Sequence, residues 1–323
     1  MNQRGSSLAV RNGRYRIRTK DRETYVPVAG VKSICLHPAT QLTYDAVLTA
    51  LEHDTDILFV DRKGFPVGRL WSNRFGSVST VRKHQLDFAR SSFGYNWVRE
   101  VLVRKLDNQM AVLDLVAALL EGTAAPRPDE PLQQLQRHRD RIGTYEITDP
   151  QEAFASFRGW EGSAGRVYFA HLSRCLPAAY RFDKRTHRGA ADAFNCLLNY
   201  AYGMLYGHCE SALIQAGIDP FIGVMHRDEY NRPVLVYDFI ELFRCWADYV
   251  VCHLCLQEIV FDEFFDIEQG QYWLNTTGKR ILIQSFNDYL AEVVVIQSLS
   301  RSRLQHITLE AQKLASTLKK FEI

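Results

Sequence analysis

The middle of the sequence holds carboxylates and a histidine in surroundings that are unusually apolar for charged groups. Asp238 and Glu241 stand three residues apart, so a helix would place both carboxylates on one face. Most of their neighbours are apolar or aromatic, and burying unpaired carboxylates among them carries a considerable desolvation cost. A divalent metal, an arginine or a solvent-filled cleft would each offset that cost. His226 precedes this helix across a short loop.

Glu161 is a further carboxylate, and it lies among glycines within an otherwise helical pattern. Gly159, Gly162 and Gly165 repeat at a three-residue spacing. Each glycine inside a helix costs about 1 kcal/mol relative to alanine. We therefore expect another backbone or a ligand to come very close to this helix, and Glu161 to point into a crowded place.

Glu161, His226 and Glu241, with Asp238 beside the last, combine oxygen ligands with one imidazole. Such a set suits Mg²⁺ or Mn²⁺ better than zinc, which favours thiolates and more histidines. A metal held by carboxylates serves phosphoryl transfer, because the ion neutralises charge on phosphate oxygens and activates the attacking oxygen. Spacing alone leaves open a structural alternative, in which these acids pair with arginines. The nearby arginines are Arg166, Arg232 and Arg244.

The elements that must position these side chains change character near residue 80. Residues 1–80 show short strand patterns separated by turn signals such as Asn12-Gly13, with one short helix expected within 41–52. Later apolar residues recur at three- and four-residue spacings, which is typical of helices. We predict an α+β protein with a small N-terminal β-rich domain, residues 1–80, and a larger all-α catalytic domain, residues 81–323. The later helices are expected over 149–176, 190–216, 233–262 and 276–321, the last broken near Ser298.

Composition limits the classes of protein to which the chain can belong. Its 323 residues are 46% hydrophobic and 24% charged, which excludes a disordered or low-complexity scaffold. The seven cysteines are an odd number, and the first residues lack the apolar run of a signal peptide, so we expect a cytoplasmic protein. The most apolar stretch, 234–261, carries several charged residues, and no membrane span is expected.

Positive charge is concentrated at the N-terminal end. Residues 1–83 contain 14 Lys and Arg against 7 Asp and Glu, a local charge of +7 within a chain of net charge +2. Arg14, Arg16 and Arg18 alternate with other residues, so a strand would place them on one face. That face could contact DNA phosphates, or it could belong to a solvated edge strand protected by charge.

Three segments resemble signature segments of the CRISPR-associated Cas1 endonuclease family, the integrase of spacer acquisition. They occur in the family's order, and shorter similarities lie at 61–70, 103–110 and 274–286. The resemblance implies that Glu161, His226 and Glu241 hold the metal, with Asp238 as a neighbouring acid. Cys245 departs from the proline usual in the last segment. The three segments are GWEGSAGRVYF (159–169), LNYAYGMLYGHCESALIQAGIDPFIGVMH (198–226) and YDFIELFR (237–244).

The resemblance also implies an architecture and partners. Family members dimerise through the N-terminal β domain, join a small Cas2 partner protein, and bind double-stranded DNA, both the incoming fragment and the repeat array. They join 3′-hydroxyl ends of captured fragments to repeat DNA by transesterification. A basic loop between the Glu161 helix and the next long helix would suit gripping phosphates. Its candidate DNA-binding residues are Arg181, Lys184, Arg185 and Arg188.

Two other functions remain open on sequence grounds. The chain could be a catalytically silent DNA-binding assembly subunit of the same fold, although a silent relative would be free to lose Glu161 or His226. It could also be a structure-specific nuclease of DNA repair, because one metal site serves both a hydroxyl and a water nucleophile. For the dimer, we expect an interface of apolar strand faces. The candidate interface residues are Ile34, Leu36, Leu58 and Val60.

Overall fold

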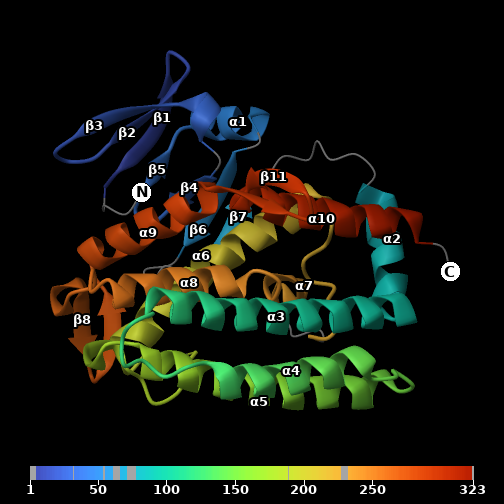
Figure 1. Ribbon diagram of the computed structural model, residues 1–323. Helices are drawn as coiled ribbons and strands as arrows, with labels where there is room; N and C mark the ends of the chain where they lie inside the picture. The colour runs from blue at the N-terminus through green and yellow to red at the C-terminus, as the bar shows by residue number, and fades with distance from the viewer. Residues whose placement is uncertain are drawn as a thin grey trace. The chain divides into compact units, whose positions relative to one another are not determined.

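The chain divides into two compact units, residues 1–76 and 77–323, a few residues before the boundary expected from sequence. Figure 1 traces the chain in the computed structural model, with the first unit in blue. Each unit is described by itself. The structure describes residues 5–31, 33–53, 55–60, 66–70, 78–187, 189–226 and 232–321, apart from the side chains of Pro66 and Val78.

The N-terminal unit contains two small sheets, with strand orders β3-β2-β1-β5 and β4-β6-β7. The hairpin between β1 and β2 turns at Asn12 and Gly13, whose φ angles of 50° and 67° lie in the left-handed region. Thr43 caps helix α1 by accepting a hydrogen bond from the backbone of Ala46. The elements are β1 (Ser7–Arg11), β2 (Arg14–Arg18), β3 (Glu23–Pro27), η1 (Val28–Gly30), β4 (Ser33–Leu36), β5 (Gln41–Leu42), α1 (Tyr44–Glu52), β6 (Asp56–Val60) and β7 (Pro66–Leu70).

Strand β2 carries the alternating arginines and lies inside its sheet. It pairs antiparallel with β1 on one side and with β3 on the other, so the edge-strand alternative is wrong. Tyr15 is 1% exposed and points into the core of the unit. Arg14, Arg16 and Arg18 therefore share the opposite face of this strand, as the two-residue period predicts.

The apolar strand residues expected at a dimer interface belong to the core of their own unit. Ile34, Leu36 and Val60 are buried, and Leu58 is half-buried. Ile34 and Leu36 lie on β4, which pairs in parallel with β6, and both pack in one cluster with Leu8, Tyr15 and Ile57. Ile34, Leu36 and Val60 are already covered within one chain, so the expectation that these three form the interface is wrong, whereas Leu58 stays partly exposed.

The C-terminal unit is mainly helical, and Figure 1 shows α3 running between α8 and the α4–α5 pair. Among the described residues no helix is long and apolar enough to cross a membrane. The helices are α2 (Val78–Ala89), α3 (Ser92–Leu119), α4 (Asp129–Thr144), α5 (Pro150–Cys175), η2 (Ala178–Tyr180), α6 (Ala193–Gln215), α7 (Val234–Ile240), α8 (Arg244–Leu256), η3 (Asp262–Phe264), α9 (Thr276–Ala291) and α10 (Arg303–Lys320).

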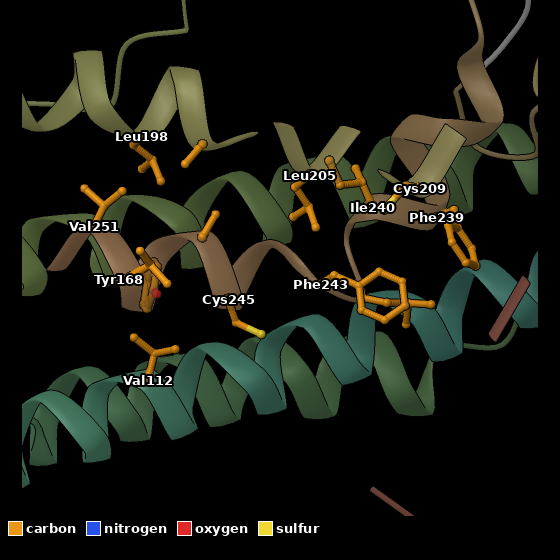
Figure 2. Packing of buried hydrophobic residues seen from close by; sticks show 14 of the residues in the cluster. Val112, Tyr168, Leu198, Leu205, Cys209, Phe239, Ile240, Phe243, Cys245 and Val251 are labelled. Atoms are coloured by element: carbon orange, nitrogen blue, oxygen red, sulfur yellow. The ribbon is translucent and has the colours of Figure 1, made fainter. Parts of the chain in front are cut away.

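Helix α6 is the central element of this unit, because its sequence is apolar on nearly all sides. It packs against α7, α8, α9 and α10. Figure 2 shows Leu198, Leu205 and Cys209 of this helix among the buried side chains of the core. Gly217, with a φ of 81°, terminates the helix, as the sequence predicts.

Three features depart from the expected all-α domain. Helix α4 lies before the later helices expected from the sequence, the first of which was 149–176. Two β-hairpins interrupt the helices, and their turns use the left-handed residues Gln269 and Gly270, then Gln297 and Ser298. The helix expected over 233–262 breaks into α7 and α8. The hairpins are β8 (Phe265–Glu268) with β9 (Gln271–Leu274), and β10 (Val293–Ile296) with β11 (Leu299–Ser302).

Candidate active site

The break between α7 and α8 follows directly after the two acids that the sequence placed on one helical face. Backbone N–H groups of Leu242 and Phe243 donate to carbonyls only three residues earlier, at 3.3 and 2.9 Å, which ends the α-helical ladder. Nδ2 of Asn108 on α3 donates to the carbonyl of Leu242 at 3.0 Å. Glu241 thus lies at the end of α7 and Arg244 at the start of α8. The two side chains pair with each other and do not contact Asp238 through any of these hydrogen bonds.

Four charged side chains meet beside this break and form the carboxylate–lysine cluster: Glu161, Lys105, Glu241 and Arg244. Nζ of Lys105 on α3 contacts Oε1 of Glu161 on α5 and lies 2.6 Å from Oε2 of Glu241. Nε of Arg244 donates to Oε1 of Glu241 at 2.8 Å. Three helices and the α7–α8 junction therefore bring two carboxylates to a single ammonium group.

Burial makes these charges depend on one another. The side chains of Lys105 and Glu241 are 9% and 8% exposed, whereas that of Glu161 is 31% exposed. Burial alone would lower the pKa of Lys105, but Glu241 and Glu161 outweigh it and raise that pKa. Burial would raise the pKa of Glu241, but Arg244 and Lys105 hold it below its usual value. Lys105 and Glu241 therefore keep their charges at neutral pH, and the cluster opens to solvent at Glu161.

Asp238 anchors the turn that carries His226. Its Oδ2 accepts hydrogen bonds from the backbone N–H groups of Val224 and Met225, at 2.9 and 3.1 Å. Its Oδ1 accepts from the backbone of His226 at 3.2 Å and lies 2.6 Å from the Nδ1 of that ring. Four contacts use the acceptor capacity of this carboxylate, so Asp238 holds the turn in place.

The contact with Asp238 also fixes which face of the histidine can act. Because Nδ1 of His226 is engaged, a metal bond from this ring would use Nε2, as in carboxylate–histidine–metal arrangements. Burial would lower the pKa of His226, but the hydrogen bond and charge of Asp238 outweigh it and raise that pKa. The described part of the chain contains no group of three or more His, Cys, Asp or Glu side chains that could hold one metal ion.

Gln85 of α2 holds the same turn from outside the signature segments. Its Nε2 donates to the carbonyls of Asp219 and Ile222 at 2.7 and 3.2 Å, and its Oε1 accepts from the backbone of Asp219 at 3.0 Å. At Gly223, a Cβ would stand 2.3 Å from the carbonyl oxygen of His226, so the turn needs a glycine there. These contacts fix the path of the chain toward His226.

The space around the glycines near Glu161 differs from the expectation that another backbone comes close to them. Apart from adjacent residues and the backbone of α5 itself, no atom of the described residues lies within 4 Å of the position that a Cβ would take on Gly159, Gly162 or Gly165. The prediction of a close backbone in this chain is wrong. The face of α5 beside Glu161 is open.

The basic loop divides into buried and exposed parts. Nη1 of Arg185 donates to Oδ1 of Asn195 at 2.8 Å, and its guanidinium lies 5.2 Å from the ring centre of Tyr202. Nε of Arg181 donates to the carbonyl of Leu176 at 3.1 Å. Lys184 is exposed. Arg185, which the sequence suggested as a DNA-binding residue, therefore fastens the loop to α6. The fourth candidate, Arg188, lies outside the described residues.

Tyr202 connects this loop to the carboxylate–lysine cluster. The guanidinium of Arg244 lies 4.6 Å from the centre of its ring, and its hydroxyl donates to Oδ1 of Asp248 at 2.5 Å. Tyr168 donates to the other oxygen of Asp248 at 3.0 Å. Burial raises the pKa of Asp248 to about 6, although both hydroxyls oppose the rise. Tyr202 thus positions the arginine that binds Glu241.

The donor chemistry fits a hard divalent cation. Two carboxylates from different helices converge on one position, and a cation, the ammonium of Lys105, lies there. Oxygen ligands of this kind are those that Mg²⁺ and Mn²⁺ prefer. The alternative that these acids pair with arginines holds for one of them, because Arg244 pairs with Glu241. Arg166, another nearby arginine, donates to Ser163.

Lys105 is the site residue that motif reasoning missed. A signal for it exists in the sequence, because it falls on the apolar stripe of α3 between Leu102 and Leu106, where helical periodicity places core residues. A lysine is almost never fully buried without a partner. Its position alone therefore predicts a buried acid opposite α3.

Comparison with known proteins places these features in a family. The profile described as CRISPR associated protein Cas1 matches residues 1–288. A CRISPR-associated endonuclease Cas1 of Archaeoglobus fulgidus is 27% identical over 298 residues, covering 88% of this chain and 86% of that protein. Another, from Thermus thermophilus, is 28% identical over 321 residues, covering 98% of this chain and 95% of that protein.

Solved structures share the fold. A casposase bound to integration product matches with a TM-score of 0.84 and 20% identity, covering 100% of this chain and 91% of that one. A Cas1 protein from Thermotoga maritima matches at 0.80 and 21%, covering 99% and 97%. A chain of a Cas6-RT-Cas1–Cas2 complex matches at 0.78 and 21%, covering 98% of this chain and 34% of that one. The predicted order, a β-rich unit followed by a helical one, is confirmed.

Proposed function

The chain belongs to the family of CRISPR associated protein Cas1, and on this premise we propose that it is a divalent-metal-dependent DNA endonuclease and integrase. It inserts captured DNA fragments as new spacers into a CRISPR array. In the joining step a 3′-hydroxyl oxygen of the fragment attacks a phosphorus atom of the repeat DNA. The bond from that phosphorus to the 3′ oxygen of the repeat breaks, and the leaving oxygen takes up a proton.

One observation carries this proposal: Glu161 and Glu241 converge on a single cation position. Mg²⁺ or Mn²⁺ would be held by these two carboxylates and by Nε2 of His226, and would supply Lewis-acid stabilisation of the phosphate oxygens. Asp238 acts on the site by orienting His226, because its own oxygens are engaged. It is therefore a positioning residue in this proposal.

Substrate access is supported by the open face of α5. Glu161 is the most exposed carboxylate of the cluster, and the glycines beside it leave room for a DNA backbone. Arg14, Arg16 and Arg18 on β2, with Lys184 in the loop, would contact phosphates, whereas Arg181 and Arg185 would hold the loop in shape. Binding should then weaken steeply as salt concentration rises.

Assembly forms the second part of the proposal. The chain would dimerise through the N-terminal unit and join a small Cas2 partner, since a chain of the same fold occurs in the Cas6-RT-Cas1–Cas2 complex. Within the described part of that unit, β3, β4 and β7 lie at sheet edges, where backbone groups can pair with a second copy. Sedimentation of the full chain should give a dimer at micromolar concentration, and a monomer would contradict this assembly.

The catalytic proposal is tested by joining a labelled duplex to a supercoiled target in Mn²⁺. Glu161→Gln and His226→Ala should abolish joining while circular dichroism shows a folded protein, and EDTA should abolish joining by the wild type. Glu152→Gln is the matched control, because this exposed acid lies on the same helix α5 without a role in the cluster. Wild-type joining rates in Glu161→Gln would overturn the assignment of the site.

A further inference from the structure

Lys105 has the position and the charge of an internal cation. It lies on the buried stripe of α3, and its ammonium contacts carboxylates from two other elements. We propose that Lys105 occupies the metal position in the metal-free protein and competes with the incoming ion for Glu161 and Glu241. This inference rests on the proposed metal-dependent function and concerns how metal binding at that site is regulated.

The surroundings of Lys105 keep its ammonium at the carboxylates. Lys105 lies between the buried Leu102 and Leu106 on α3, and its side chain is 9% exposed. A buried ammonium without a partner is costly, so in the absence of another anion the group remains with Glu161 and Glu241. The lysine therefore stabilises the two carboxylates in the arrangement that a divalent ion would need.

Glu241 shows how the exchange could proceed. Its Oε1 accepts a directed hydrogen bond from Arg244. Its Oε2 lies 2.6 Å from Nζ of Lys105, yet this buried atom has no directed hydrogen bond among the described residues. Arg244 can keep its hold on one oxygen while the other is transferred from the ammonium to a metal ion.

The charges of the cluster then link metal binding to DNA. Lys105 and Arg244 balance Glu161 and Glu241, so the metal-free cluster is electrically neutral. A divalent ion adds two positive charges to a partly buried place, and like charges close together repel. A DNA phosphate would relieve that repulsion and would give the displaced ammonium a new anionic partner. Metal should therefore bind weakly to the free protein and more tightly with DNA present.

The test is a titration of the full chain with Mn²⁺ in the absence of DNA, followed by electron paramagnetic resonance. Lys105→Gln removes the competing charge, and Lys105→Met does so while keeping an apolar stem of similar length. Both variants should bind Mn²⁺ at least about tenfold more tightly than the wild type. Lys105→Arg retains the charge and should bind as weakly as the wild type.

Thermal unfolding provides a second readout, independent of activity. Without Lys105 the two carboxylates repel each other, so both neutral variants should melt lower than the wild type in EDTA. Adding Mn²⁺ should raise their Tm by more than it raises that of the wild type. Addition of duplex DNA should tighten Mn²⁺ binding strongly in the wild type and only slightly in Lys105→Gln.

A further variant separates failure of this inference from failure of the proposed function. Glu161→Gln should lose Mn²⁺ binding, because it removes one carboxylate ligand. If the wild type, Lys105→Gln and Lys105→Met all fail to bind Mn²⁺, the metal site itself is misassigned. If they bind with equal affinity while Glu161→Gln does not bind, the metal site stands and competition by Lys105 is overturned.

Discussion

Glu241 and Asp248 are both buried carboxylates, seven residues apart across the α7–α8 junction, and they are held by opposite kinds of partner. Glu241 contacts the cations Lys105 and Arg244. Asp248 accepts hydrogen bonds from the neutral hydroxyls of Tyr168 and Tyr202. The first pair of partners lowers the pKa of Glu241, whereas burial raises the pKa of Asp248 to about 6.

This difference shows that the charge of the partners, and not burial, separates a site carboxylate from a supporting one. An acid that remains ionised beside cations can exchange one cation for another. An acid held by hydroxyls has no cation to exchange and serves to fix the rings that donate to it. Through Tyr202, which lies against the guanidinium of Arg244, Asp248 supports Glu241 without sharing its chemistry.

The largest expected effect is a loss of stability that is greater for substitution of Glu241 than for substitution of Glu161. Glu241→Ala leaves Lys105 with one carboxylate and takes from Arg244 the carboxylate that it pairs with, so the free energy of unfolding should fall by about 3–5 kcal/mol. Glu161→Ala removes a more exposed partner and should cost no more than about 1 kcal/mol. Urea denaturation at neutral pH measures both. Equal losses would mean that the cluster is not organised around Glu241.

The pH dependence of stability should show the contrast between Asp248 and Glu241 directly. Because the pKa of Asp248 is higher in the folded state than in the unfolded state, its proton is retained on folding, and stability falls as pH rises from about 4 to 6. Asp248→Asn should remove this fall, which amounts to about 2–3 kcal/mol for this shift. Urea denaturation of both proteins across that range measures the difference. Parallel stability curves would contradict the raised pKa.

The contribution of Glu241 to stability should change with pH in the opposite direction to that of Asp248. Its pKa is lower in the folded state, so its contribution to stability is complete above the ordinary pKa of a glutamate and is lost as pH falls below it. Below about pH 4 the wild type should therefore lose stability faster than Glu241→Gln. The same denaturation series, extended to lower pH, measures this second window.

A smaller effect is expected where the two regions touch. Tyr202→Phe removes the hydroxyl that donates to Asp248 but keeps the ring against Arg244. The free energy of unfolding should fall by about 1.5–3 kcal/mol, the usual contribution of a hydrogen bond to a charged group. Tyr202→Leu removes the ring as well and should weaken Mn²⁺ binding, which Tyr202→Phe should leave unchanged. Equal Mn²⁺ affinities in both variants would show that the ring does not position Arg244.

The smallest effect comes from an ion pair one residue away on α3. Nη1 of Arg104 lies 2.6 Å from Oε1 of Glu310, with side chains 36% and 18% exposed. Glu310→Ala should cost less than about 1 kcal/mol, because water screens this pair. A cost similar to that of Glu241→Ala would remove the distinction between buried and exposed ion pairs on which the comparison rests.

Local sequence signals predicted most of the elements and the motif residues. The strand period placed Arg14, Arg16 and Arg18 on one face, and Gly217 marked the end of α6. Such features depend on a few neighbouring residues, so they can be inferred without the fold. The Glu161 and His226 assignments came from the resemblance of segments, which carried information that spacing alone lacked.

The features that escaped prediction depend on contacts between distant segments. The break at Glu241 is fixed by Asn108 of α3, more than a hundred residues earlier, and Lys105 acquires its role only when α3, α5 and α7 meet. Arg185 belongs to a basic loop in the sequence, yet the fold buries it against Tyr202. In each case the partner is chosen by tertiary packing, which the local pattern does not encode.

The central claim is that Glu161 and Glu241 share one metal ion at the position of Lys105. The most direct measurement is an anomalous difference map from crystals of the full chain soaked in Mn²⁺. A peak between the two carboxylates, with the ammonium of Lys105 moved aside and Nε2 of His226 facing the ion, is the predicted result. A peak elsewhere, or crystals in which saturating Mn²⁺ leaves Lys105 between both carboxylates, would contradict the account.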